Sequence, residues 1–115
     1  MRKAGVSDPA LLAAVTEMMQ GLIDADLGGY VVKKRVALPG QGKRGGARTI
    51  VATRMSDRWI FLFGFSKSER SSIDKVELKL FQEMAKDLLA FNERQLADAL
   101  SAGEITEVHD GDKKA

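Results

Sequence analysis

Residues 30–65 read YVVKKRVALPGQGKRGGARTIVATRMSDRWIFLFGF, and this segment contains the three strands that the sequence predicts. Its first part, Tyr30 to Leu38, is rich in β-branched and basic residues, which predicts a strand with cations on both faces near a sheet edge. Arg48 to Arg54 predicts a second strand after the glycine-rich segment. Trp59 to Phe65 is almost wholly apolar, which suits a third strand buried on both faces in the middle of the sheet.

The glycines between the first two strands form a G-x-G-x-x-G pattern at Gly40, Gly42 and Gly45. In a dinucleotide-binding unit, this pattern is followed at once by a helix whose N-terminus faces the phosphates. Here the β-branched Arg48–Arg54 segment follows, without a helix-capping residue. The pattern therefore predicts a mobile hairpin loop, in which glycine supplies positive φ and flexibility.

Helical patterns flank the predicted strands. Ser7-Asp8-Pro9 is typical of a helix start, and apolar residues recur behind it at helical spacing as far as Leu22. After the third strand, Asp74 with Glu77 forms a capping-box pattern. The helix behind it ends near Phe91, and its expected apolar stripe is Val76, Leu80, Phe81, Met84, Leu88 and Leu89.

A further short helix is predicted from Asn92, with Gln95 as its capping partner and Gly103 as its stop. The order helix, three strands, two helices indicates an α+β fold. We expect a small antiparallel sheet of three to four strands, with an edge that could be mixed, packed against the N-terminal and C-terminal helices. Residues 8–108 should form one domain, and the polar residues 109–115 a disordered tail.

Charge is unevenly distributed along the chain. Between Tyr30 and Arg70 ten Lys and Arg face two acids, whereas the rest of the chain holds eight basic and fourteen acidic residues. A basic middle segment attracts polyanions. The chain has no cysteine, which excludes disulfides and thiolate chemistry, and its apolar runs are too short for a membrane span. It also lacks a secretory signal, so the default expectation is a cytoplasmic protein.

The basic middle segment supplies the candidate site. Lys33 and Arg35 point to one face of the first strand, Arg48 begins the second, and Lys67 and Arg70 follow the third. Because neighbouring strands lie about 5 Å apart, these five side chains could line one surface. Arginine and lysine neutralise phosphates, so an RNA- or DNA-binding surface is the favoured interpretation, and a solvated basic face without a ligand is the alternative.

Such a surface could also cleave RNA. The 2′-hydroxyl of RNA is an internal nucleophile, a lysine among other cations can transfer protons, and arginines stabilise the charge of the pentavalent phosphate. The sequence predicts no metal site and no cofactor, and its single histidine, His109, lies in the tail.

The segment from Gly28 to Ile73, GGYVVKKRVALPGQGKRGGARTIVATRM…RWIFLFGFSKSERSSI, resembles the RelE/HigB superfamily of bacterial toxins from toxin–antitoxin pairs. The basic strand, the G-x-G-K-x-G-G-x-R run and the later G-F-x-K-x-E-R carry the resemblance. It implies a metal-independent endoribonuclease that cuts mRNA on the ribosome. It also implies the site residues: catalytic Arg48, Lys33, Arg35, Lys67 and Arg70, with Lys34 and Glu69 as RNA contacts. Lys43 and Arg44, on the glycine-rich loop, should also contact RNA.

The resemblance has two departures at catalytic positions. Ser68 stands where RelE itself has an arginine, and Asp74 corresponds to a tyrosine. The leading hypothesis is an mRNA-cleaving toxin; the alternative is a non-catalytic nucleic-acid- or antitoxin-binding module on the same fold. The expected partners are a cognate antitoxin with a helix-turn-helix, mRNA and the ribosome, and operator DNA only through the antitoxin complex. No membrane partner is expected.

Overall fold

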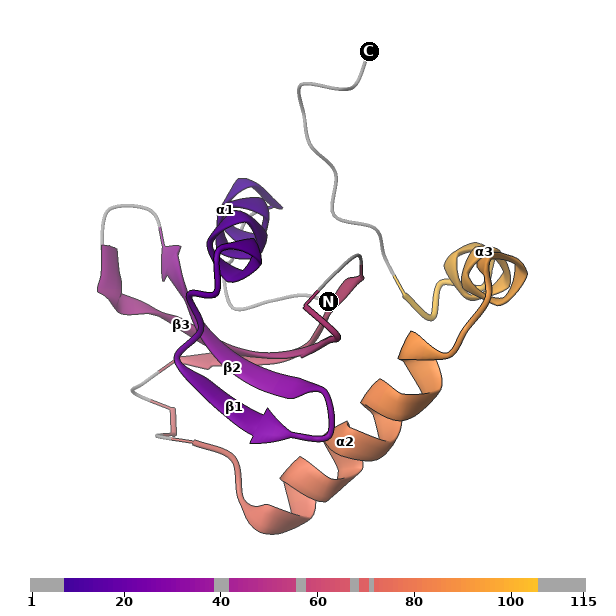
Figure 1. Ribbon diagram of the computed structural model, residues 1–115. Coiled ribbons are helices and arrows are strands. Elements are labelled where there is room, and N and C mark those ends of the chain that lie inside the picture. The colour runs from indigo at the N-terminus through magenta and orange to yellow at the C-terminus, as the bar shows by residue number, and fades with distance from the viewer. Residues whose placement is uncertain (1–7, 39–41, 56–57, 67–68, 71, 106–115) are drawn as a thin grey trace.

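The structure is a computed structural model that describes residues 8–38, 42–55, 58–66, 69–70 and 72–105. Its elements follow in the order α1 (Asp8–Met19), β1 (Ala25–Gly28), β2 (Val31–Leu38), β3 (Gly42–Thr53), β4 (Trp59–Ser66), α2 (Lys75–Leu89) and α3 (Glu93–Ser101). The strands form one antiparallel sheet in the order β1-β2-β3-β4. This arrangement confirms the predicted α+β fold (Figure 1).

Helices cover the sheet on two opposite faces (Figure 1). Because side chains alternate along a strand, each inner strand contributes residues to both layers. On what we call the α1 face, the buried residues are Leu11, Ala14, Met18, Val32, Val36 and Val51. On the α2 face, they are Val31, Ile50, Ala52, Phe65, Phe81, Ala85 and Leu89.

The apolar strand β4 lies at an edge of the sheet, so its predicted place in the middle is wrong. Its apolar sequence has another cause: its residues are mostly half-buried and join the apolar clusters on both faces of the sheet. Trp59 and Phe61 pack on the α1 face, whereas Phe63 and Phe65 belong to the α2 face. A register shift between Ile50 and Val51 of β3 produces this change along β4, as a β-bulge does.

The glycine-rich segment contributes more strand and less loop than predicted. β3 begins at Gly42, so two of the three motif glycines lie within the strand, and Gly40 lies outside the described residues. The adjacent Gly46 is required by close approach rather than by its φ angle. A Cβ atom at this position would stand 2.1 Å from the carbonyl oxygen of Val36.

The first helix is shorter than its pattern predicted. α1 ends at Met19, which is 64% exposed, and Leu22 beyond it is 53% exposed. The short strand β1 follows, which sequence analysis missed, and it pairs with β2 through a tight turn. Gly28, Gly29 and Tyr30 adopt positive φ angles in this turn.

The C-terminal helices follow the prediction closely. Both capping boxes are present: Asp74 with Glu77 at the start of α2, and Asn92 with Gln95 at the start of α3. Gly103 has a φ angle of 77° just after α3, consistent with its predicted role as a stop. None of the helices in the described part of the chain is long and apolar enough to cross a membrane.

Candidate nucleic-acid interface

Cations from two neighbouring strands meet on the α2 face. Arg35 of β2 lies directly opposite Arg48 of β3, and Lys33 lies opposite the buried Ile50. On its other side, Arg48 lies opposite Phe65 of β4, which is buried on the α2 face. Directly opposite residues of an antiparallel pair point to the same face. Lys33, Arg35 and Arg48 therefore share the α2 face, near the end where β2 connects to β3.

Arg48 contains the most unusual polar atom of this group. Its side chain is partly buried, and its Nη1 atom is shielded from solvent without a hydrogen-bond partner among the described residues. A buried donor without a partner costs roughly 1–3 kcal/mol. An anion with several oxygen acceptors would remove this cost, and a guanidinium can bind a phosphate with two nitrogen atoms at once.

Arg70 adds a fourth cation to this surface. Its guanidinium carbon lies 5.8 Å from the ring centroids of both Phe63 and Phe65. Arg48 and Arg70 are thus both neighbours of Phe65, one across the strand register and one over the ring. We call Lys33, Arg35, Arg48 and Arg70 together the basic face.

A carboxylate from α2 holds Arg70 in place. Nη1 and Nη2 of Arg70 donate to the two carboxylate oxygens of Glu77, the first at 2.9 Å, and Nε donates to the Ser72 carbonyl oxygen. Glu77 also accepts from the Asp74 backbone as part of the α2 capping box. The hydrogen bond from Arg70, assisted by that backbone donor, lowers the pKa of Glu77, and the same pair raises the pKa of Arg70. Arg70 therefore has a rigid carboxylate partner.

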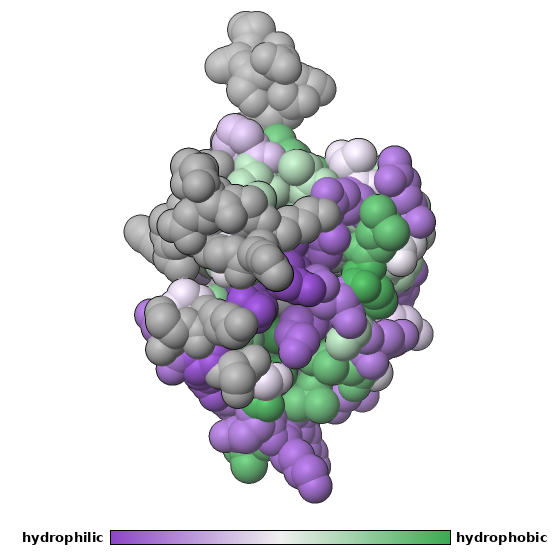
Figure 2. Space-filling view, turned by 90° about the vertical axis from the view of Figure 1, so that its left-hand side faces the viewer, coloured by the Kyte–Doolittle hydropathy of each residue, from purple (hydrophilic) through white to green (hydrophobic). Residues whose placement is uncertain are grey.

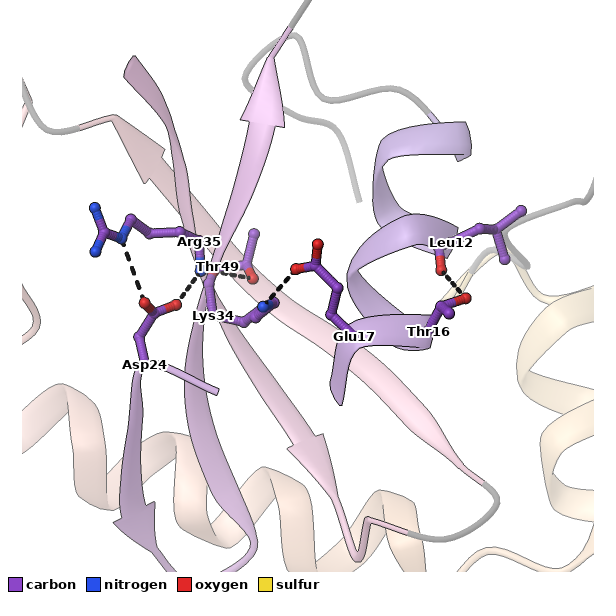
Figure 3. Close-up of polar contacts among 7 residues, drawn as sticks. All are labelled: Leu12, Thr16, Glu17, Asp24, Lys34, Arg35 and Thr49. Carbon is purple, nitrogen blue, oxygen red and sulfur yellow. Dashed lines mark hydrogen bonds and ion pairs between the residues drawn. The ribbon is translucent and has the colours of Figure 1, made fainter. Parts of the chain in front are cut away.

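Arg35 also has a carboxylate partner (Figure 3). Asp24, just before β1, accepts from the Arg35 backbone nitrogen through one oxygen and from Arg35 Nε at 3.3 Å through the other. Within the described residues, Lys33 and Arg48 have no such partner. The uncompensated charge of the basic face is thus concentrated on these two side chains.

Figure 2 presents the side of the molecule where the ends of β2 and β3 approach each other. Strongly hydrophilic residues gather near the middle of this view, and hydrophobic residues lie at their side. Arg35 remains 41% exposed in its side chain despite its contact with Asp24. A ligand can therefore reach Arg35 from solvent.

Lys34 points to the opposite side of the sheet. Its side chain is only 5% exposed, and its Nζ atom lies 2.7 Å from a carboxylate oxygen of Glu17 on α1 (Figure 3). Thr49 of β3 donates to the backbone carbonyl of Lys34 from the same buried layer. The structure thus does not bring Lys34 together with Lys33 and Arg35, although the three are adjacent in the sequence.

Other residues predicted for the site either lie away from the basic face or are outside the described residues. Glu69 closes the turn after β4, because its carboxylate accepts from the Ser66 backbone nitrogen at 2.9 Å. Lys67 and Ser68 lie outside the described residues, as do the side chains of Lys43 and Arg44. His109 and the predicted tail are also outside them.

Sequence analysis missed two other roles of charged residues. Asp24 and Glu77 were not recognised as partners of cations, since Asp24 precedes Arg35 by eleven residues and no local pattern joins them. Arg54 and Arg58 were counted only as positive charge. Instead, Arg58 Nη1 donates to the carbonyl oxygens of Leu88, Leu89 and Phe91, and Arg54 Nη1 to that of Leu89. Both cap the C-terminus of α2, where cations are favoured.

The described residues contain no group of three or more His, Cys, Asp or Glu placed to hold a metal ion.

Comparison with known proteins gives one family. A family model described as "RelE toxin of RelE / RelB toxin-antitoxin system" matches residues 1–108. The match spans every described strand and helix, including all four residues of the basic face. No curated protein sequence matches the chain.

Proposed function

The chain belongs to the RelE toxin family, and we propose that it cleaves mRNA as a metal-independent endoribonuclease whose phosphate site is built around Arg48. Family membership makes it the toxin of a toxin–antitoxin pair, and such toxins generally cleave mRNA. The observation that carries the proposal is the shielded Nη1 atom of Arg48, which has no protein acceptor among the described residues. Because this atom is shielded from solvent, the partly buried Arg48 side chain would have to shift for the scissile phosphate to supply that acceptor.

The reaction needs three contributions from the protein: a base, an acid and a group that stabilises negative charge. The 2′-oxygen attacks the adjacent phosphorus, its proton is removed, and the 5′-oxygen leaves with a proton, so that a 2′,3′-cyclic phosphate forms. Arg48 would bind the phosphate oxygens and stabilise the extra negative charge of the pentavalent intermediate. Because this charge is larger than in the ground state, the contact strengthens as the reaction proceeds.

Lys33 is the described residue best placed for proton transfer. It is adjacent to Arg35 along the same face of β2, and no described carboxylate competes for its ammonium group. A lysine within reach of the 2′-hydroxyl or of the leaving oxygen could transfer a proton in this reaction. Lys67 remains a second candidate for this role on sequence grounds alone.

Arg35 and Arg70 would bind flanking phosphates. Each is held by a carboxylate, Asp24 or Glu77, so its guanidinium is oriented before RNA arrives. Such positioning lowers the entropy lost on binding. Lys43 and Arg44, whose side chains are not described, would contact RNA from the start of β3. Lys34 would support β2 from the opposite face, because it is paired with Glu17.

A non-catalytic binding module is the second candidate, and one observation favours it. Asp74, which corresponds to a catalytic tyrosine of RelE, accepts a hydrogen bond from the Glu77 backbone nitrogen at 2.8 Å as the cap of α2. It therefore serves the helix rather than a leaving group. In this case the basic face would bind nucleic acid or an antitoxin segment without cleaving RNA.

Family membership also implies a cognate antitoxin. We propose that this partner carries a helix-turn-helix, that operator DNA is contacted through the antitoxin complex, and that the toxin acts on ribosome-bound mRNA in the cytoplasm.

The test is induction of the parent chain, Arg48→Ala and Arg94→Ala, each followed by mapping of mRNA 5′ ends at equal soluble expression. Arg94 is a matched control, because its side chain is 84% exposed on α3 and far along the chain from the basic face. New 5′ ends should appear with the parent and with Arg94→Ala, and disappear with Arg48→Ala. Growth arrest without new ends would instead support the binding module.

A further inference from the structure

The outer flank of α2 exposes apolar side chains that the sequence pattern assigned to its buried stripe. Val76 is 80% exposed and Leu80 is 55% exposed, whereas Phe81, Ala85 and Leu89 of the same helix are buried against the sheet. Figure 1 shows α2 along the lower side of the molecule, with one flank toward the strands and the other toward solvent. The exposed pair therefore contributes nothing to the core.

These two residues border a shallow groove of about 510 Å³. Its lining consists of Lys75, Val76, Lys79, Leu80 and Glu83. On a helix, residues four apart form ridges, so the groove lies between a charged ridge that begins at Lys75 and an apolar ridge that begins at Val76. Helices that pack nearly antiparallel cross at about +20°, with ridges of one helix lying in grooves of the other.

The charges of the first ridge have a fixed order. Lys75 and Lys79 lie in the first half of α2, and Glu83 and Asp87 follow at the same spacing in the second half. Lys75 at the first helical position and Asp87 in the last turn both oppose the helix dipole, which favours acids at the N-terminus and cations at the C-terminus. This order of charges is therefore unfavourable for an isolated α2. In an antiparallel pair of α2 helices, however, the lysines of one copy would face the acids of the other.

We propose that the outer flank of α2 is the interface of a symmetric homodimer, in which α2 packs antiparallel against α2 of a second copy. A two-fold axis at the level of residue 81 places Lys79 near Glu83 of the second copy and Lys75 near Asp87 of the second copy. The same axis brings the two Leu80 side chains together at the centre. One operation thus brings Leu80 against its own copy and forms both charge pairs, as a self-complementary C2 interface requires.

The partner that we propose for this flank is a second copy of the chain. The charged ridge carries both lysines and acids, so a partner with charges of a single sign would be repelled by half of it. The contact is limited to one helix of 15 residues, so its area falls at the low end of specific interfaces. The dimer is therefore weak and depends on concentration. Its charge pairs lie at the rim and are screened by salt. None of the residues of this interface belongs to the basic face, although Glu77 in the first turn of the same helix holds Arg70.

Sedimentation velocity of the purified full-length chain over a range of concentrations tests the dimer. The parent should show a concentration-dependent shift from monomer to dimer, weakened by salt, and Leu80→Asp should raise the dimer Kd by about tenfold or more. The sharper test uses two charge-reversed chains, one with Lys75→Glu and Lys79→Glu, the other with Glu83→Lys and Asp87→Lys. Each should stay monomeric alone, and an equimolar mixture should form dimers.

Both reversed chains should fold, because each places its new charges in agreement with the helix dipole. Circular dichroism and thermal melting of each chain confirm this before the mixture is interpreted. A parent chain that stays monomeric at every soluble concentration overturns the proposal. So does a mixture that associates no better than its components. If the parent is monomeric and Leu80→Asp weakens antitoxin binding instead, the flank belongs to the antitoxin and the homodimer is wrong.

Discussion

Replacement of Arg48 by methionine is expected to stabilise the folded protein while it removes the phosphate site. In the parent, the Nη1 atom of Arg48 is shielded from solvent and has no acceptor among the described residues. Methionine keeps an unbranched stem that can pack beside Phe65, and it has no donor left to satisfy. The substitution therefore removes the cost of an unpaired donor and retains most of the packing.

The size of the effect follows from one buried donor. An unsatisfied donor costs roughly 1–3 kcal/mol, and more when it is charged. Part of this gain is offset because methionine fills less volume than arginine, and a small gap beside Phe65 costs some of the packing energy. We expect the free energy of unfolding to rise by about 1–2 kcal/mol. Proteins commonly show such a trade between stability and function at binding sites.

Urea unfolding of the purified full-length chain measures this directly. The parent and Arg48→Met are compared at constant ionic strength, with and without inorganic phosphate, and Arg94→Met on exposed α3 is the control. Phosphate that binds only the native parent should raise its stability, by about 2.7 kcal/mol at a concentration of 100 Kd, and should affect the variant much less. Arg94→Met should respond to phosphate as the parent does.

Two results would refute this reasoning. If Arg48→Met lowered the free energy of unfolding by about 1 kcal/mol or more, the guanidinium would have a structural acceptor, and its isolation would not mark a ligand site. If phosphate stabilised the parent and the variant equally, anion binding would occur elsewhere on the chain.

Three further predictions concern ion pairs and caps. Glu17→Ala leaves the buried ammonium of Lys34 without its carboxylate, so the free energy of unfolding measured in urea should fall by about 2–3 kcal/mol. A chain with both Glu17→Ala and Lys34→Met should recover most of this loss. Arg58→Ala removes the donor to three carbonyl oxygens at the end of α2, so the free energy of unfolding should fall by about 1.5–3 kcal/mol. Hydrogen exchange in the last turn of α2 should become faster, and an unchanged exchange pattern would argue against the cap. Because Arg70 lowers the pKa of Glu77, this carboxylate stabilises the fold above its unfolded pKa of about 4.3, and the contribution is lost as pH falls through the lower native value. Urea midpoints measured from pH 6 downward should therefore fall less for Glu77→Gln than for the parent, and parallel curves would contradict this.

Local sequence patterns predicted the parts of the fold that depend on neighbouring residues. The capping boxes at Asp74 and Asn92 each place an acceptor three residues before its donor, so four residues suffice to identify the helix start. The basic strand was likewise evident from its β-branched composition. The pairing of Arg35 with Arg48 required the register as well, and register depends on the whole sheet.

The failures involved contacts between distant parts of the chain. β4 was predicted in mid-sheet because an apolar strand signals burial on both faces, and the sequence does not indicate that an edge strand joins apolar clusters on both faces. Val76 and Leu80 fit the helical period yet remain exposed, because the period fixes the spacing of a stripe but not how wide a stripe the sheet covers. A count of charges along the sequence does not reveal the carboxylates that hold Arg35 and Arg70, because it does not show which residues are in contact.

Cleavage of a defined mRNA on ribosomes by the purified chain, with one nucleotide changed, tests whether the chain is an endoribonuclease. The cut site is first located on ordinary RNA, and the same message is then made with a 2′-deoxy nucleotide on the 5′ side of that bond. If the chain is an endoribonuclease that uses the 2′-hydroxyl, ordinary RNA is cut to leave a 2′,3′-cyclic phosphate, and neither the deoxy-substituted RNA nor the Arg48→Ala chain gives a product. Equal cleavage of both RNAs, or no cleavage of either by a folded and growth-arresting chain, would contradict the account.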